Sequence, residues 1–124
     1  MNLIDLALWI MTALLVAAFG ASAVVKGTRP KERVLQLGMT GVVDIPVPLM
    51  RFIAACEMCG IIGLVVPHLT GIAPILTSLA AIGLGIIMLL AARIHLRLDE
   101  RRTAGGNLIL LLICVLVAFG RWPT

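Results

Sequence analysis

A single carboxyl group stands in the middle of a long apolar segment. Glu57 lies nine residues after Pro48, which is roughly 13 Å along a helix that rises about 1.5 Å per residue. In a bilayer this position is near the midplane, where a carboxyl group is costly unless it is protonated, paired or hydrated. Glu57 is therefore a candidate functional residue. The alternative is a neutral, hydrogen-bonded glutamic acid that only joins helices.

Three more polar side chains lie at the ends of apolar segments. Lys26 closes the first segment, His95 closes the third and Asn107 opens the fourth. If the segments are membrane helices, these residues and Glu57 can line a polar pocket that opens toward one membrane face. Each of the three alone is more often an interface anchor or a helix cap, and the case for a pocket rests on their occurrence together. We expect Glu57 to be neutral or to share a hydrogen bond with His95, Asn107 or a ligand.

Arg51 is a fifth candidate for ligand binding. It lies six residues before Glu57, so at about 100° per residue the two side chains point about 120° apart on a helix. Arg51 is also close enough to the end of its segment to reach the headgroups, and its alternative role is an interface anchor. On the third segment Arg93 and Arg97 share a face, and His95 points away from both. If the arginines face the headgroups, His95 faces the bundle.

The cysteines offer weaker chemistry. Cys56, Cys59 and Cys114 all lie inside apolar segments. Thioredoxin-like motifs place their cysteines at a helix N-terminus, where the thiolate is stabilised, whereas Cys56 and Cys59 lie well inside a helix. We interpret them as small packing residues, although a redox role stays open. The sequence predicts no metal site, because these cysteines lack His or Asp at ligand spacing.

The composition indicates a protein that faces lipid. Of the 124 residues, 61% are apolar and 13% are charged, whereas soluble domains are roughly 45–50% apolar and about 25% charged. A small soluble domain cannot bury that much apolar surface. The net charge of +4 does not indicate nucleic-acid binding, because the charges are confined to the gaps between apolar segments and few aromatic residues lie among them.

The apolar segments predict an all-α integral membrane four-helix bundle that forms a single domain over residues 1–124. The expected helices span about 5–25, 48–66, 73–95 and 104–122, each near the roughly 20 residues that a bilayer requires. Continuous rather than alternating apolar runs exclude a barrel. Pro30–Leu37 is expected as a short helix lying in the interface, with a plain loop as the alternative. Small residues at packing spacing predict close helix contacts at Ala13, Ala17 and Ala21 and at Ala81 and Gly85.

The loop charges predict the orientation. The loops that follow the first and third helices carry nearly all the cations, namely Lys26, Arg29, Lys31, Arg33, Arg97, Arg101 and Arg102. The positive-inside rule places both loops in the cytoplasm. Both termini are then expected outside the cytoplasm.

The whole chain resembles the DoxX-like family of small bacterial four-helix membrane proteins. The resemblance is carried by the order and spacing of five stretches, namely 23–30 (AVVKGTRP), 48–60 (PLMRFIAACEMCG), 63–67 (GLVVP), 91–95 (AARIH) and Asn107. The positions that look characteristic of the family are Lys26, Arg51, Glu57, His95 and Asn107. The resemblance implies a location in the bacterial inner membrane. It also implies a link to redox complexes, since the family takes its name from a subunit associated with thiosulfate:quinone oxidoreductase.

Three functions follow as hypotheses. The leading one is a non-catalytic or accessory membrane subunit. It would bind a quinone or another lipophilic molecule in the polar pocket, beside a redox partner subunit. The second is a membrane anchor or assembly factor in which the buried polar residues only fix helix packing. The third, a transporter-like channel, is disfavoured because no segment has a Pro-interrupted middle. The expected partners are membrane lipids and a redox subunit, with no nucleic acid. A homo-oligomer is left open, and a quinone is the only candidate cofactor.

Overall fold

Four long helices carry the apolar segments of the chain. The computed structural model describes residues 2–123, and its long helices are α1 (Leu3–Thr28), α3 (Val47–Thr70), α4 (Ile75–Arg97) and α5 (Arg101–Gly120). Each is long and apolar enough to cross a bilayer. The prediction of an all-α, four-helix membrane protein is confirmed.

The first helix is longer than predicted at both ends. It begins at Leu3 because the side chain of Asn2 accepts a hydrogen bond from the Asp5 N–H at 2.7 Å, which satisfies a free amide of the first turn. It ends at Thr28 because Pro30 disfavours helical geometry in the residue before it, and Arg29 is extended.

The other helices begin and end within two residues of the expected positions, apart from two boundaries. Helix α3 runs through Pro67 to Thr70 and closes on Gly71 in the left-handed conformation. Pro67 removes one main-chain hydrogen bond, yet the helix completes one more turn, and Gly71 N–H donates to Pro67 O at 2.9 Å. Helix α5 begins at Arg101 rather than near residue 104, and Gly105 and Gly106 are helical. Their low helix propensity is too small a penalty to stop a helix that continues into a long apolar segment.

The connection between α1 and α3 is folded rather than open. It contains α2 (Lys31–Gln36) and the one-turn helix η1 (Thr40–Val42). Gly38, at φ +91°, ends α2 in a left-handed cap that closes with a hydrogen bond from Met39 N–H to Val34 O at 3.3 Å. Val34, Val42 and Met50 form a small buried core beneath it. The short helix predicted at Pro30–Leu37 is confirmed, and its place in the membrane interface remains a prediction.

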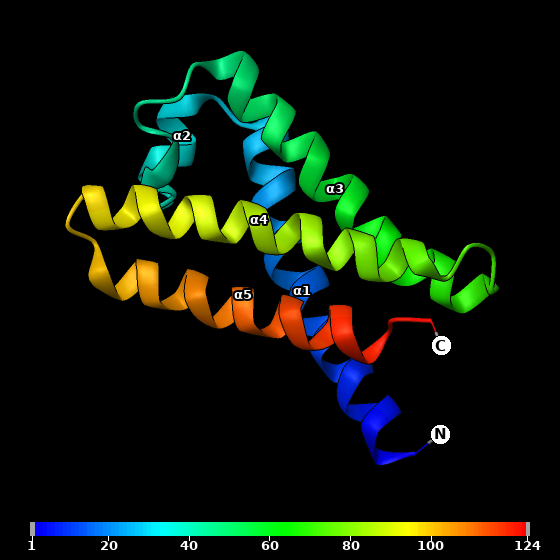
Figure 1. Ribbon diagram of the computed structural model, residues 1–124. Coiled ribbons are helices and arrows are strands. Elements are labelled where there is room, and N and C mark those ends of the chain that lie inside the picture. Colours follow the sequence, from blue (N-terminus) through cyan, green and yellow to red (C-terminus); the bar gives the residue numbers. More distant parts are fainter. Residues whose placement is uncertain (1, 124) are drawn as a thin grey trace.

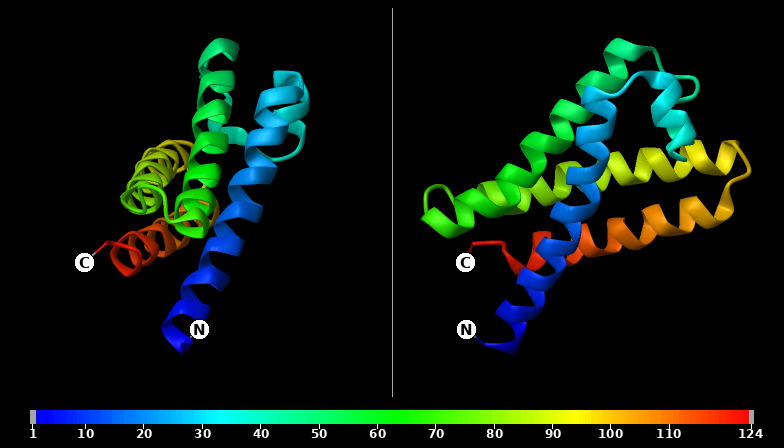
Figure 2. Two further views of the ribbon diagram at one scale, coloured as in Figure 1. Left: turned by 90° about the vertical axis from the view of Figure 1, so that its right-hand side faces the viewer. Right: turned by 180° about the vertical axis from the view of Figure 1, so that it is seen from behind.

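The long helices form two pairs that cross. In Figure 1, α4 and α5 lie side by side and α1 passes behind them at a steep angle. Figure 2 shows α1 and α3 side by side in its left view, in which α4 and α5 are seen nearly end-on. The right view shows α2 and η1 reaching from the α1–α3 end toward the turn between α4 and α5. At this end the two crossing pairs diverge, and the space between them is called the wedge below. The α2–η1 segment covers the wedge.

Small residues permit a close contact between α3 and α4. A Cβ on Gly63 of α3 would lie 2.9 Å from the Cβ of Ala80 on α4, so this contact requires glycine. Ala81 and Gly85 are buried, as the sequence predicted. The prediction for Ala13, Ala17 and Ala21 is wrong, since all three are exposed. The buried face of α1 consists instead of Leu8, Thr12, Leu15, Phe19 and Ala23.

An ion pair holds the two ends of the described chain together. Arg121 Nη1 donates to Asp5 Oδ1 at 2.6 Å, and the guanidinium lies 5.2 Å from the ring centre of Trp9. The Trp9 ring also contacts His68 of α3, with ring centres 5.4 Å apart. This cluster joins α1, α3 and the end of α5 on the side opposite the wedge.

Candidate functional site

The wedge between the helix pairs encloses a cavity of about 300 Å³. Its wall takes residues from all four long helices and from the segment around η1. Most of the wall is apolar, with Phe19 and Met88 as large buried side chains. The polar residues on the wall are Ser22, Lys26, Glu57, His95, Thr103 and Asn107. Four of the five residues singled out from the sequence therefore share one cavity.

An ion pair between α1 and α3 forms the deepest polar part of the wall. Lys26 Nζ lies 3.0 Å from Glu57 Oε1. The Glu57 side chain is fully buried, and the Lys26 side chain is 16% exposed. Lys26 ends an apolar helix, yet its ammonium group turns inward rather than toward the headgroups. The expectation that His95 or Asn107 would be the protein partner of Glu57 is wrong, because the partner is Lys26.

Arg51 supports this pair from outside the cavity. Its Nη1 donates to the main-chain carbonyls of Lys26 at 2.6 Å and Arg29 at 2.7 Å. The last carbonyls of a helix lack partners within the helix, and an arginine satisfies them with a charge-assisted bond. Arg51 therefore caps α1 and does not line the cavity. The angle of about 120° between Arg51 and Glu57 is what separates the two roles.

His95 is tied to the turn between α4 and α5. Helix α4 ends with Asp99 in the left-handed conformation (φ 59°) and a hydrogen bond from Glu100 N–H to His95 O at 2.8 Å. This cap turns Glu100 back toward the helix, and Glu100 Oε1 lies 3.0 Å from His95 Nδ1. Thr40 of η1 donates its hydroxyl to the same carboxylate at 2.7 Å. His95 is buried, whereas Arg93 and Arg97 are exposed, as the sequence predicted.

These contacts also set the charge of the Glu100 carboxyl. The hydrogen bond with His95, followed by the one from Thr40, holds the pKa of Glu100 below its usual value of 4.5. Glu100 is then ionised at neutral pH, and its carboxylate accepts a hydrogen bond from His95 Nδ1. The remaining ring nitrogen, Nε2, faces the η1 segment, since a Cβ on Gly41 would lie 3.2 Å from it. The Thr40–Glu100–His95 contacts thus fasten the α2–η1 segment over the cavity.

Two polar atoms on the cavity wall are left without a partner. Glu57 Oε2 and Asn107 Nδ2 are both buried and have no hydrogen-bond partner among residues 2–123. An unsatisfied buried polar group costs about 1–3 kcal/mol, and more when it is charged. One of the two atoms is an acceptor on α3 and the other is a donor on α5. The cavity is therefore equipped to form hydrogen bonds of both kinds.

Sequence reasoning missed Thr40 and Glu100, which fasten the cover of the cavity, and Asp5 and Arg121, which pair at the opposite end. Glu100 follows His95 by five residues across a helix end, a separation that helical periodicity does not describe. Asp5 and Arg121 carried a usable signal. In the predicted topology they are opposite charges on the same membrane face, at the two ends of the chain.

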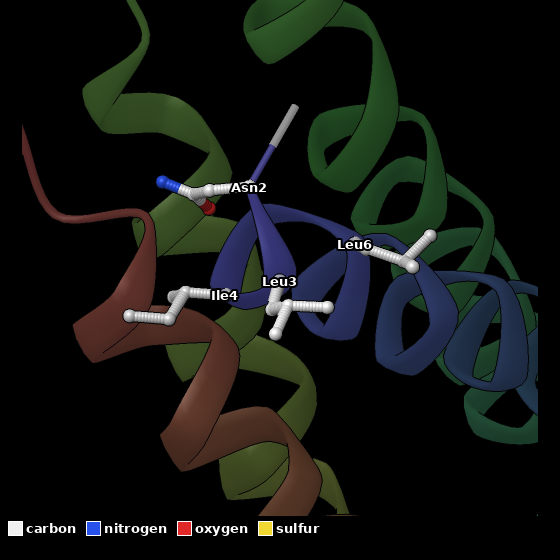
Figure 3. Close-up of a pocket in the computed structure, with 4 residues that line it drawn as sticks. All are labelled: Asn2, Leu3, Ile4 and Leu6. Carbon is white, nitrogen blue, oxygen red and sulfur yellow. The ribbon is translucent and has the colours of Figure 1, made fainter.

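Two further findings bear on the choice of site. A hollow of about 600 Å³ lies at the start of α1, lined by Asn2, Leu3, Ile4 and Leu6. In Figure 3, Ile4 and Leu6 point to opposite sides of the helix, and none of the four described lining residues has a titratable side chain. Within the described residues, no three His, Cys, Asp or Glu side chains are grouped closely enough to hold a metal ion. The Glu57 cavity is therefore the candidate functional site.

Fold and site together define a small multi-pass helical membrane protein with a polar cavity between its helices. The sequence model of the DoxX-like family matches residues 10–117, a range that includes all five predicted site residues. The chain belongs to the DoxX-like family. No curated protein and no solved structure matches it.

Proposed function

We propose that this protein is an accessory subunit of the bacterial inner membrane that binds a lipophilic molecule in the Glu57 cavity. The observation that carries the proposal is the pair of polar atoms without a partner in residues 2–123, Glu57 Oε2 and Asn107 Nδ2, in a mainly apolar wall. Pockets for small molecules combine an apolar lining with a few convergent polar groups in this way. A quinone beside a redox partner subunit is the candidate occupant. Lys26 and Glu57 would orient its polar head, and His95 would stand near the entrance.

The resemblance that suggests a quinone rests on the family name rather than on the geometry. What the geometry supports is a ligand with an apolar body and a polar head, since the wall is mainly aliphatic and its polar groups converge. The cavity also has lining residues that are exposed, among them Thr103 and Leu90. An occupant could therefore enter without unfolding of the bundle.

A structural role is the second candidate, and it too has an observation in its favour. The Lys26–Glu57 pair and the two hydrogen bonds of Arg51 all join α1 to α3. Polar contacts of this kind fix helix register in membrane proteins. In this case the protein would serve as an anchor or assembly factor.

Native mass spectrometry of the gently extracted full chain distinguishes the two. We expect a lipophilic molecule or a partner subunit to co-purify with the wild type, and less of the molecule to be retained by a folded Glu57→Gln variant. The matched control is Thr77→Val, because Thr77 Oγ1 is another buried atom without a partner in residues 2–123 but lies outside the cavity. A Glu57→Gln variant equal to wild type in thermal stability and retained ligand would favour the structural role.

A further inference from the structure

The hydrogen-bonding capacity left on the cavity wall points to a specific chemical class of ligand. Lys26 occupies Glu57 Oε1, so the carboxylate offers only Oε2, an acceptor with two lone pairs. Asn107 offers Nδ2, which can only donate. A ligand that satisfies both must bring one donor and one acceptor. A hydroxyl group brings both on a single oxygen.

The charge of the cavity wall further restricts the chemical class of the ligand. Lys26 and Glu57 neutralise each other at 3.0 Å, and His95 Nδ1 is engaged by the Glu100 carboxylate. The wall therefore has no uncompensated cation to hold an acid. An anion would lose its hydration on entering such a cavity, and no cation of the wall would compensate for that loss. The ligand head should be neutral.

The apolar wall separates an organic ligand from water. A water molecule also has donors and acceptors, but it gains nothing from the aliphatic and aromatic side chains around Phe19 and Met88. An apolar body gains about 25 cal/mol for each Å² that it buries there. The cavity of about 300 Å³ also exceeds the space that one or two waters need.

We infer that the Glu57 cavity selects a neutral, hydroxyl-bearing apolar molecule of the phenol or quinol type over acceptor-only carbonyl or ether compounds. This inference rests on the proposed ligand-binding function and names the class of ligand for that site. The hydroxyl donates its proton to Glu57 Oε2, and its oxygen accepts from Asn107 Nδ2. For a quinone-type occupant, the reduced form would be held more tightly than the oxidised form.

The full chain in lipid nanodiscs allows a direct test. The probes are para-butylphenol and para-butylanisole, which have the same apolar body but differ in that the methyl ether cannot donate. Binding is followed by NMR of methyl-labelled methionines, because Met39 and Met88 line the cavity whereas Met11 and Met58 do not. The last two methyl groups pack against the main core and report on the fold of each variant.

In wild type the phenol should shift Met39 and Met88 at a concentration roughly ten- to hundredfold lower than the anisole, the factor expected for one hydrogen bond to a charged group. Glu57→Gln turns the free acceptor into an amide donor, so the preference should vanish or reverse. Asn107→Leu should weaken both probes equally and keep the preference. Thr77→Val should change neither.

The outcomes separate the inference from the proposed function. If both probes shift Met39 and Met88 at the same concentration, the cavity binds lipophilic molecules and the hydroxyl selectivity is refuted. If neither probe moves these methyl groups in wild type, the proposed function falls as well. Tighter binding of para-butylbenzoate than of the phenol would refute the neutral head.

Discussion

Arg51 Nη1 donates to the main-chain carbonyl of Lys26 at 2.6 Å, and the ammonium group of the same lysine pairs with Glu57 at 3.0 Å. Two residues of α3 thus contact Lys26 of α1. Arg51 binds its main-chain carbonyl, and Glu57 binds its side-chain ammonium group. The backbone contact satisfies a carbonyl at the end of α1. The contact with Glu57 holds the Lys26 ammonium group on the cavity wall instead of at the membrane surface.

The capping role of Arg51 can be measured by thermal unfolding. Arg51→Leu removes two charge-assisted hydrogen bonds to the end of α1 and should lower the free energy of unfolding by about 2–4 kcal/mol. Arg97→Leu, at an exposed arginine near the end of α4, serves as the control and should have little effect. Equal effects of the two substitutions would show that Arg51 acts only as a surface cation.

The Lys26–Glu57 pair predicts non-additive effects. Lys26→Met leaves a fully buried carboxylate without its cation, and loss of one partner of a buried pair typically costs about 3–5 kcal/mol. The double variant Lys26→Met, Glu57→Met replaces both partners by apolar groups and should recover much of this loss. A double-mutant cycle from thermal unfolding in one detergent gives the coupling. Additive losses would argue against a direct interaction.

Acid should release the cover of the cavity through Glu100. Because the folded state holds the pKa of Glu100 below 4.5, the ionised carboxylate stabilises the fold above that pH. The contribution is lost as the pH falls through the lowered pKa. The thermal midpoint of wild type should therefore drop more than that of Glu100→Gln between about pH 5 and pH 3. Glu32→Gln, at an exposed carboxyl group of α2, should behave like wild type.

The orientation in the membrane is predicted by the basic loops. Alkaline phosphatase, which is active only outside the cytoplasm, should be active when fused after Thr124. A fluorescent protein that folds only in the cytoplasm should be dark at the same position. Fusions within the α2–η1 segment should give the opposite pattern. Fluorescence from the fusion after Thr124 would show that the orientation is the reverse of the predicted one.

The cysteines are expected to matter only for packing. Cys56 is half-buried and Cys59 is exposed on α3, so changing both to Ala should alter stability by no more than about 0.5 kcal/mol. Cys114 lies in the main core, and its change to Ala should cost about 1 kcal/mol because it leaves a small void. Thermal unfolding and ligand retention are the measurements. Loss of retained ligand in the Cys56→Ala, Cys59→Ala variant would reveal a redox or binding role.

The sequence alone was enough for the membrane class, the four long helices and the short helix before Gly38. These follow from local rules: the length of an apolar run, the geometry before a proline and the conformational freedom of glycine. It was also enough to select Lys26, Glu57, His95 and Asn107 as residues of interest. A polar group inside an apolar segment stands out from its neighbours without any knowledge of packing.

Which of these groups meet was decided only by the tertiary structure. Helical periodicity gives the direction of a side chain within its own helix, but it says nothing about how far a neighbouring helix is shifted or tilted. The packing of α1 against α3 brings Lys26 to Glu57, and the crossing of this pair with α4–α5 leaves Asn107 Nδ2 without a partner among residues 2–123. The left-handed turn at Asp99 directs Glu100, rather than Glu57, to His95. Both outcomes depend on the relative placement of elements that are far apart in the chain, and no local pattern encodes that placement.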